Sequence, residues 1–420
     1  MFAGINNDRM IIGYDLANTC SQISYCYIKE DSNVETVSPI AGEENYDIPT
    51  VLCKRRGANQ WLCGNEALRY CREYPDEGIL VENILQMAVD GENIQIDGKG
   101  YKPISLLTLF VKRSLSLLAG VGSTDRIAAL MFTGAELTPA LVDVLGEVSL
   151  KLDLKRTRIY FQDYAESFYH YMLYQPKDLW KDQSLLLDYR EEKIKSMRLT
   201  CNEKTRPIVV YMEEARHDFD GQDESLLQIA QEVIGNSSCR TSSVYLIGEK
   251  FTGDWMSSTL RYLCEGRRVF QGNNLYSKGA CFSLLEKIQV SHAGAEHVYL
   301  GSEKLKANVG MKVFKRGEES YFALLDGGIN WYETEYTCEL YLQDEDKLEF
   351  VITPLIGRNV RYLEMPLDGL GLKEGDTTRI QMHLYLLQEN IMCVEVSDLG
   401  FGSFRLPAET KWRKEMELYE

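Results

Sequence analysis

Two aspartates stand at the same place in two similar stretches of the chain. Asp15 follows an apolar run in MIIGYDLANTCSQISYCYI (10–28), and Asp188 follows another in SLLLDYREEKIKSMRL (184–199). In each stretch an alternating segment comes after a turn, which is typical of a β-hairpin. Such a carboxylate can organise Mg²⁺ and its waters beside a phosphate. It can also close the hairpin turn by accepting local hydrogen bonds, and this second interpretation is the one we favour.

The turn of the second hairpin lacks the glycines that a phosphate-binding loop needs. It reads Arg190-Glu191-Glu192-Lys193, so that two carboxylates face the place where a phosphate would bind. Like unit charges 4 Å apart cost about 1 kcal/mol in water and about 4 kcal/mol at an effective dielectric constant of about 20. We expect Arg190 and Lys193 to pair with the two glutamates as surface side chains.

Cysteine and histidine give no sign of a metal centre. The 11 cysteines are odd in number and scattered, and no C-x-x-C pair occurs among them. This usage predicts reduced, mostly buried thiols. The five histidines form no set with ligand spacing, so each is expected to be structural. They are His170, His217, His292, His297 and His383.

Composition and charge are those of a soluble globular protein. The chain has 420 residues, 45% of them hydrophobic, and a formal net charge of −17. Such an acidic chain is a poor partner for nucleic acid or anionic membrane, because both require a basic face. The most apolar helical stretch, 104–119, is interrupted by Lys112 and Arg113, and the N-terminus does not resemble a signal peptide. We therefore expect a cytoplasmic protein.

Helical and extended patterns alternate over the first two thirds of the chain. The apolar run IAALMF (127–132) predicts a strand inside a parallel sheet. A helix over 137–150 should begin at Thr138, with Pro139 in its first turn. Further helices are expected at 65–74, 104–118, 163–174, 225–234, 257–264 and 278–285, and further strands at 49–53, 158–161, 207–212 and 243–247.

After about residue 287 the helical patterns give way to short strands between turns. The expected strands are 312–314, 321–325, 336–342, 348–352, 379–386 and 392–396. Regular strands between turn signals favour an antiparallel β-sandwich. The last residues, 410–420, are expected to form a short charged helix or a frayed tail. The sequence thus predicts an α/β domain over 1–287 and a β-sandwich over 288–420.

The order of these segments resembles the actin-like ATPase superfamily, and within it the DnaK-type heat-shock chaperones. IIGYDLANTCSQISYCYI is similar to the first phosphate hairpin, G-I-D-L-G-T-T-N-S, and LLLDYREEKIKSMRL stands where the second, D-L-G-G-G-T-F-D, belongs. VYLIGEKFTGDWMSSTLRYL resembles the adenosine segment V-G-G-S-S-R-I-P, and the C-terminal part resembles a peptide-binding sandwich. The resemblance implies a duplicated, ribonuclease H-like fold over the first domain, with a shortened second lobe.

Carried over residue by residue, the resemblance implies that Asp15, Thr19, Asp188 and Gly248 would bind a nucleotide cofactor, if one binds. Several matching positions depart from the family. Ala17 and Asn18 replace a glycine and a threonine of the first hairpin, and Glu249 replaces the second glycine of the adenosine turn. No basic residue lies between Arg72 and Lys99, where the chaperones carry a lysine that faces the phosphate. These departures predict no catalytic residue, no metal site and no cofactor.

The sequence therefore predicts a non-catalytic, DnaK-like pseudo-chaperone of bacterial type that acts as a scaffold or as a protein- or peptide-binding module. The chain ends at Glu420, so no helical lid is expected over the sandwich. Two alternatives stay open: an ATP-binding, chaperone-like ATPase that uses ATP and Mg²⁺ despite its divergent loops, and an actin-like filament former. Candidate exposed apolar residues in the second domain are Phe314, Tyr321, Phe322, Trp331 and Tyr332, although an ordinary sandwich core accounts for most of them. The sequence names neither the partner nor the oligomeric state.

Overall fold

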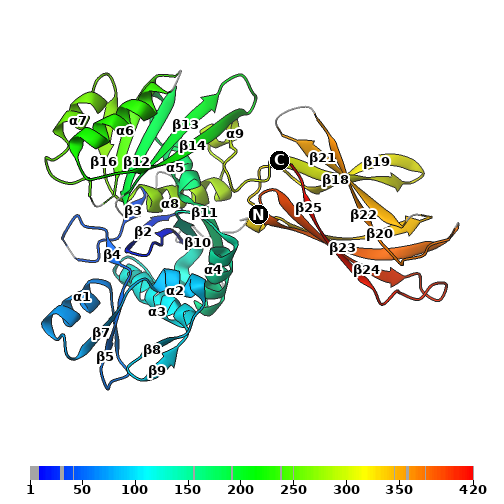
Figure 1. Cartoon of the computed structure of the whole chain (residues 1–420), viewed down its shortest axis with the longest axis horizontal. Helices are drawn as coiled ribbons and strands as arrows, with labels where there is room; N and C mark the ends of the chain where they lie inside the picture. The colour runs from blue at the N-terminus through cyan, green and yellow to red at the C-terminus, as the bar shows by residue number, and fades with distance from the viewer. Residues whose placement is uncertain are drawn as a thin grey trace. The chain divides into compact units, whose positions relative to one another are not determined.

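The computed structural model describes residues 9–28, 33–40, 42–154, 157–190, 193–236, 239–248, 250–344, 346–355, 359–373 and 375–419. The chain divides into two compact units, Met1–Tyr299 and Leu300–Glu420. The first unit mixes helices and sheets and the second consists mainly of strands, as Figure 1 shows. The prediction of an α/β part followed by a β-rich part is confirmed at this level.

Two six-stranded sheets of the first unit share one strand order. In the first sheet the central strand β1 (Met10–Asp15) pairs antiparallel with β2 (Cys20–Tyr27) and parallel with β10 (Ile127–Gly134). Outside them lie β3 (Glu35–Thr36) and β11 (Arg158–Asp163), which gives the order β11-β10-β1-β2-β3. The sixth strand, β4 (Ile48–Pro49), pairs with β2 off this path.

The second sheet repeats this arrangement. Its central strand β12 (Gln183–Arg190) pairs antiparallel with β13 (Lys193–Asn202) and parallel with β15 (Thr241–Ile247). Outside them lie β14 (Ile208–Asp218) and β16 (Arg268–Gln271), so that five strands follow the order of the first sheet, and β17 (His297–Tyr299) is added beyond β14.

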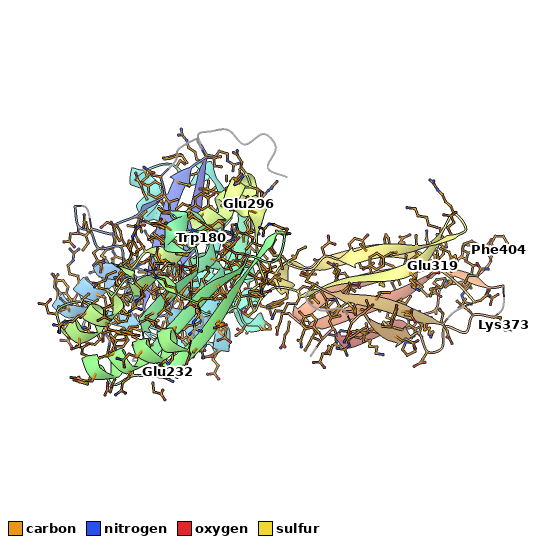
Figure 2. The ribbon with its side chains drawn as sticks, turned by 90° about the horizontal axis from the view of Figure 1, so that it is seen from above. Trp180, Glu232, Glu296, Glu319, Lys373 and Phe404 are labelled. Carbon is orange, nitrogen blue, oxygen red and sulfur yellow. The ribbon has the colours of Figure 1, made fainter. Side chains whose placement is uncertain are left out.

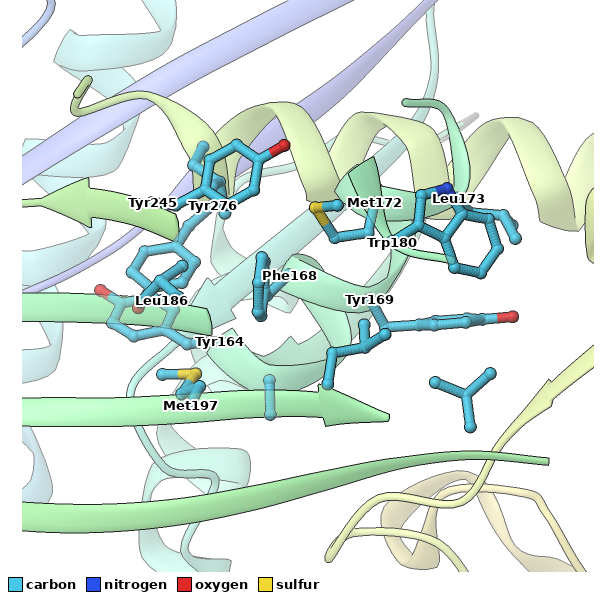
Figure 3. Packing of buried hydrophobic residues seen from close by; sticks show 14 of the residues in the cluster. Tyr164, Phe168, Tyr169, Met172, Leu173, Trp180, Leu186, Met197, Tyr245 and Tyr276 are labelled. Carbon is cyan, nitrogen blue, oxygen red and sulfur yellow. The ribbon is translucent and has the colours of Figure 1, made fainter. Parts of the chain in front are cut away.

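Two helices occupy equivalent places, each after the outer parallel strand of its sheet. They are α5 (Tyr164–Leu173), which follows β11, and α8 (Leu275–Ile288), which follows β16. The buried face of α5 packs on Leu186 and Met197 of the second sheet (Figure 3). Ala280 and Leu284 of α8 belong to the core of the first sheet. Each helix therefore packs on the sheet of the other half, which joins the two halves of the unit.

The crossing of α5 and α8 requires a glycine. A Cβ added to Gly279 of α8 would lie 1.9 Å from the backbone oxygen of Ser167 of α5. Because both atoms belong to rigid helix backbones, only a residue without a side chain permits this approach.

A smaller subdomain lies between β2 and β10 in the sequence. It contains a three-stranded sheet in the order β6-β5-β7, which is flanked by the helix α1. The elements of this part are β4 (Ile48–Pro49), β5 (Leu52–Arg55), β6 (Trp61–Cys63), α1 (Gly64–Glu73), β7 (Gly78–Val81), α2 (Ile84–Asp90), β8 (Ile94–Ile96), β9 (Lys99–Tyr101) and α3 (Pro103–Leu115). The remaining helices of the unit are α4 (Pro139–Lys151), α6 (Asp223–Gly235), α7 (Ser257–Leu263) and α9 (His292–Glu296).

Within the described part of the chain, one stretch, Pro103–Gly120, is long and apolar enough to cross a membrane by length and composition alone. In the structure half of it is buried, and its helix α3 contacts α2 and α4. This burial is typical of a core helix in a soluble protein.

The second unit consists of two four-stranded antiparallel sheets, ordered β19-β18-β21-β22 and β20-β23-β24-β25. Their strands are β18 (Ala307–Lys315), β19 (Glu318–Leu325), β20 (Glu335–Gln343), β21 (Lys347–Pro354), β22 (Arg361–Pro366), β23 (Thr377–Gln388), β24 (Ile391–Gly400) and β25 (Lys411–Glu417). The first unit extends to Tyr299, because β17 pairs with β14. The sequence predicts the boundary between the two domains earlier, after residue 287.

The expectation of a helix or frayed tail over 410–420 is wrong. Lys411–Glu417 forms strand β25, which pairs antiparallel with β24. Trp412, Met416 and Leu418 are buried, with 8%, 6% and 0% of their surfaces exposed. These three residues share the period of two that is characteristic of a strand with one buried face. Their burial against the sheet decides the structure of the tail.

Candidate functional site

Asp15 and Asp188 lie at equivalent places in the two sheets. Asp15 ends β1 and pairs in register with Thr133 of β10, while Asp188 of β12 pairs with Ile247 of β15. In each case a glycine stands at the end of the parallel partner strand. Gly134 is the last residue of β10, and Gly248 directly follows β15. The side chains of the two aspartates are buried, with about 1% and 5% of each residue exposed. Two buried carboxylates require cationic or hydrogen-bonding partners.

Arg190 supplies the cation for both carboxylates. Its Nε atom lies 3.1 Å from Oδ1 of Asp188, and its Nη2 atom lies 3.7 Å from Oδ2 of Asp15. The Arg190 side chain is 29% exposed, so the contact is largely shielded from solvent. The expectation that Arg190 is a surface side chain is therefore wrong. Arg190 pairs with the two buried carboxylates and not with surface glutamates. Leaving a buried charge unpaired costs far more free energy than losing a surface ion pair.

Two tyrosines complete the shell around the aspartates. The Tyr164 hydroxyl donates to Oδ1 of Asp15 at 2.5 Å, and the Tyr276 hydroxyl donates to Oδ2 of Asp188 at 2.9 Å. Their rings stack with centroids 3.8 Å apart and planes inclined by 4°. The Arg190 guanidinium lies 5.1 Å and 5.3 Å from the two ring centroids, and its Nη1 atom donates to the Tyr164 hydroxyl at 3.0 Å. Figure 3 shows both tyrosines in the buried cluster of α5.

The interpretation that the two aspartates merely close their hairpin turns does not describe these contacts. Asp15 binds a tyrosine from α5, and Asp188 binds one from α8, so both carboxylates hold distant parts of the chain together. The tyrosines lie in the first turns of the two equivalent helices described above. The contact therefore repeats in both halves, with Arg190 shared between them.

Burial controls the acidity of this cluster. Desolvation raises the pKa of Asp15 to about 6, although Arg190 and the Tyr164 hydrogen bond act in the opposite direction. Desolvation also raises the pKa of Tyr164 and of Tyr276 well above its usual range. Burial by itself lowers the pKa of Arg190, but the neighbouring tyrosines and aspartates raise it well above its ordinary value. The guanidinium therefore stays charged and the phenols stay protonated at neutral pH.

A cavity of about 240 Å³ opens beside this cluster. Its lining contains three of the four residues that the sequence singled out, namely Asp15, Thr19 and Gly248. Asp188 lies outside the lining and reaches the site through Arg190. The described residues of the lining are Asp15, Thr19, Cys20, Gln22, Asp47, Tyr189, Arg190, Gly248, Lys250 and Asn273. The structure thus brings the predicted residues together around one cavity.

Among the described residues that line the cavity, charged groups of both signs occur. Asp15 and Asp47 carry the negative charges, and Arg190 and Lys250 the positive ones. Nε2 of Gln22 donates to Oδ1 of Asp47 at 2.6 Å.

A magnesium ion held by the two aspartates does not fit this arrangement. The Asp15 and Asp188 oxygens described above bind Arg190 and the two tyrosine hydroxyls, so a metal would have to displace these groups. Among the residues that the structure describes, no group of three or more His, Cys, Asp or Glu side chains is arranged to hold a metal ion.

Gly248 has a structural reason to be glycine. Its φ angle is +110°, and an added Cβ would lie 2.3 Å from the backbone oxygen of Tyr189. Both facts exclude a side chain at this position. The retained glycine is therefore explained by its contact with the neighbouring strand, without any need for a phosphate.

The sequence missed several residues of the site. Tyr164, Tyr276, Asp47 and Lys250 carried no local signal, because each is brought to the site by an element remote from the two hairpins. Three acidic residues that replace glycines of the family motifs lie outside the described residues. They are Glu191, Glu192 and Glu249.

Fold and site together define a mixed α/β protein with a duplicated sheet and an internally neutralised pair of acids. Residues 33–302 match the model of a family described as a family of unknown function (DUF5716), C-terminal. Because this match covers more than half of the chain, the chain belongs to that family. Residues 304–418 match a second model, described as a domain of unknown function (DUF8552). No curated protein matches the chain.

Proposed function

We propose that the first unit is a divergent, actin-like frame of the DnaK type that has lost nucleotide chemistry, and that the protein is a cytoplasmic, non-catalytic scaffold or protein-binding module. Two features support the actin-like, ribonuclease H-like assignment. Five strands follow one order in both sheets, and an aspartate stands at the equivalent place of each central strand. A duplicated frame of this kind is what the resemblance to the chaperones implies.

The position of Arg190 carries the proposal that the site is non-catalytic. In a nucleotide site of this type the space between the two acids belongs to a metal ion and phosphates. Here the guanidinium contacts both acids and both tyrosine rings. Moving it out would leave two buried carboxylates facing each other, and breaking a buried ion pair in this way costs about 3–5 kcal/mol. A nucleotide would have to recover that cost before it gained any affinity.

Exposed aromatic residues of the second unit support a protein-binding role. Phe404, Leu406 and Tyr341 are 89%, 82% and 66% exposed. Phe401 lies 6.1 Å from Tyr341 and 6.2 Å from Phe404 between ring centroids, so these residues form one patch. Figure 2 shows the Phe404 side chain at one end of the unit. Exposed apolar patches frequently mark sites of interaction with other proteins.

The candidate contact residues that the sequence named lie in different environments. Phe314 and Tyr321 are 81% and 51% exposed, and Phe322 and Tyr332 are partly buried. Trp331 is only 7% exposed, and its Nε1 atom donates to Oε2 of Glu303 at 2.6 Å. Trp331 is therefore a core residue, as the alternative of an ordinary sandwich core expects for most of these candidates. The two antiparallel sheets are compatible with the sandwich that we propose for this unit.

A second candidate function, ATP binding, is favoured by the cavity itself. Asp15, Thr19 and Gly248, which match the nucleotide motifs of the family, lie together in its lining. In this alternative a nucleotide with Mg²⁺ displaces Arg190 from the aspartates.

Thermal unfolding with millimolar Mg·ATP, Mg·ADP or EDTA distinguishes the two candidates. A ligand present at 100 times its dissociation constant stabilises the folded state by about 2.7 kcal/mol, which corresponds to a shift of a few degrees. The proposal predicts the same midpoint in all three conditions. A rise that is specific for ATP would overturn it and would support the ATP-binding alternative.

A further inference from the structure

Two cysteines face each other between β5 and α1, away from the aspartate site. Cys53 lies in the middle of β5 and is fully buried, whereas Cys71 lies near the end of α1 and is partly exposed. Both belong to one small apolar core together with Val51, Leu62 and Ala67. Neither Cys53 nor Cys71 is part of a disulfide in the structure.

The geometry of this pair is unusually close. The Sγ atoms are 2.8 Å apart, with Cys71 as the donor. Gly78 of β7 provides the space for them, because a Cβ at this position would lie 2.9 Å from Sγ of Cys71 and 3.0 Å from Sγ of Cys53. The sulfurs would need to approach by less than about 1 Å to reach the length of a disulfide bond.

We propose that Cys53 and Cys71 are a redox modification site, at which a small-molecule disulfide such as oxidised glutathione converts the two thiols into an intramolecular disulfide. The modification is reversible, so the thiols persist in a reducing compartment and the bond forms under oxidising conditions.

The reaction proceeds by two thiol–disulfide exchanges. Cys71 reacts first because its thiol is the more accessible one. Its thiolate attacks one sulfur of oxidised glutathione, forms a mixed disulfide and releases one glutathione thiolate. Burial and the contact with Cys71 raise the pKa of Cys53 to about 12, which makes Cys53 a poor first nucleophile. Cys53 then loses its proton and attacks Sγ of Cys71, which releases the second glutathione. One oxidant molecule becomes two thiols, and the protein loses two hydrogen atoms.

The disulfide would fasten α1 to β5 at a segment that continues into the cavity wall. Asp47 of the cavity precedes β4 and β5, and the Thr50 amide between these strands donates to the Thr19 oxygen at 2.9 Å. Closing the loop from Cys53 to Cys71 restricts the unfolded chain and stabilises the folded one. Oxidation is therefore expected to stiffen the part of the chain that carries one wall of the cavity.

The test uses the full chain, first reduced and then incubated with oxidised glutathione. Trypsin places Cys53 alone in peptide 30–54, Cys71 in peptide 70–72 and Cys63 in peptide 57–69. Mass spectrometry without reduction is expected to find 30–54 joined to 70–72 as the main product, lighter by two hydrogen atoms. Cys71→Ser is expected to abolish this product, and the control Cys63→Ser, on the neighbouring strand, is expected to retain it.

Thermal unfolding of the oxidised wild-type chain gives a second readout that needs no variant. The unfolding midpoint is expected to rise by a few degrees on oxidation and to return after treatment with dithiothreitol. The proposal is overturned if Cys71 carries only glutathione, if the main bond joins other cysteines, or if the thiols do not react.

Discussion

The phenol rings of Tyr164 and Tyr276 lie parallel, with centroids 3.8 Å apart, and each hydroxyl binds the buried aspartate of a different sheet. The two residues lie in the first turns of equivalent helices, so the contact joins the two halves of the first unit. Arg190 lies against both rings and both aspartates. The cluster is therefore a structural joint between the two halves of the unit.

Replacing Arg190 should destabilise the protein strongly. Arg190→Gln removes the cation and leaves two buried carboxylates, so the free energy of unfolding should fall by about 3 kcal/mol. Lys193→Gln is the matched control, because Lys193 is the cross-strand neighbour of Arg190 and is exposed. The control should stay within about 0.5 kcal/mol of wild type. Denaturant titration measures both variants, and equal effects in the two would contradict the assignment.

Removing one tyrosine hydroxyl should have a smaller effect. Tyr164→Phe keeps the ring stack but takes a hydrogen bond from the buried Asp15 carboxylate. Hydrogen bonds to charged groups contribute about 1.5–3 kcal/mol, and the free energy of unfolding should fall by this amount. Tyr341→Phe changes an exposed ring and should be neutral. A neutral Tyr164→Phe would show that the hydroxyl contact has no energetic weight.

Asp15 should make the free energy of unfolding fall as the pH rises, which is the opposite of the usual effect of a carboxylate. Its pKa is raised from 3.8 to about 6 in the folded state, so the folded protein holds this proton more tightly than the unfolded chain. The contribution of this proton to the free energy of unfolding is fully present below about pH 4 and is lost as the pH rises through about 6. The free energy of unfolding of wild type, relative to Asp15→Asn, should therefore rise when the pH is lowered from 7 to 4.5. A constant difference between the two proteins would refute the raised pKa.

Two helical glycines should respond in opposite ways to alanine. Gly279→Ala places a Cβ 1.9 Å from a backbone oxygen of α5, so the free energy of unfolding should fall by several kcal/mol as α5 and α8 separate. Gly146→Ala in α4 has no atom within 4 Å of its new Cβ. Alanine is about 1 kcal/mol better than glycine inside a helix, so this variant should be more stable than wild type. Thermal unfolding of both variants measures the contrast, and similar midpoints would contradict the close crossing.

Local sequence signals predicted most of the regular structure. Thr138 begins α4 as expected, and its hydroxyl accepts from the Leu141 amide. The apolar run 127–132 lies inside β10, which pairs in parallel with strands on both sides. Signals of this kind depend on a few neighbouring residues and are therefore readable without a structure. The same reasoning could have found β25, since Trp412, Met416 and Leu418 already alternate in the sequence.

The site depends on contacts that no local pattern contains. Arg190 next to two glutamates predicts a surface ion pair, but its partners include Asp15, which comes from the opposite sheet. Tyr164 and Tyr276 come from α5 and α8, and both belong to the buried cluster of α5. They do belong to the core, and their hydroxyls additionally bind the aspartates. These contacts can be predicted only when the packing of the two halves is known. A buried charge must be paired, and its partner can come from any part of the sequence.

The coupling between Arg190 and Asp15 tests the central claim most directly. A double-mutant cycle compares wild type, Arg190→Gln, Asp15→Asn and the double variant by denaturant titration. If Arg190 is the internal cation of the buried acids, the double variant should be more stable than the sum of the single effects predicts, by about 1 kcal/mol or more. Single effects that add to within about 0.3 kcal/mol would contradict the account, since independent sites behave in that way.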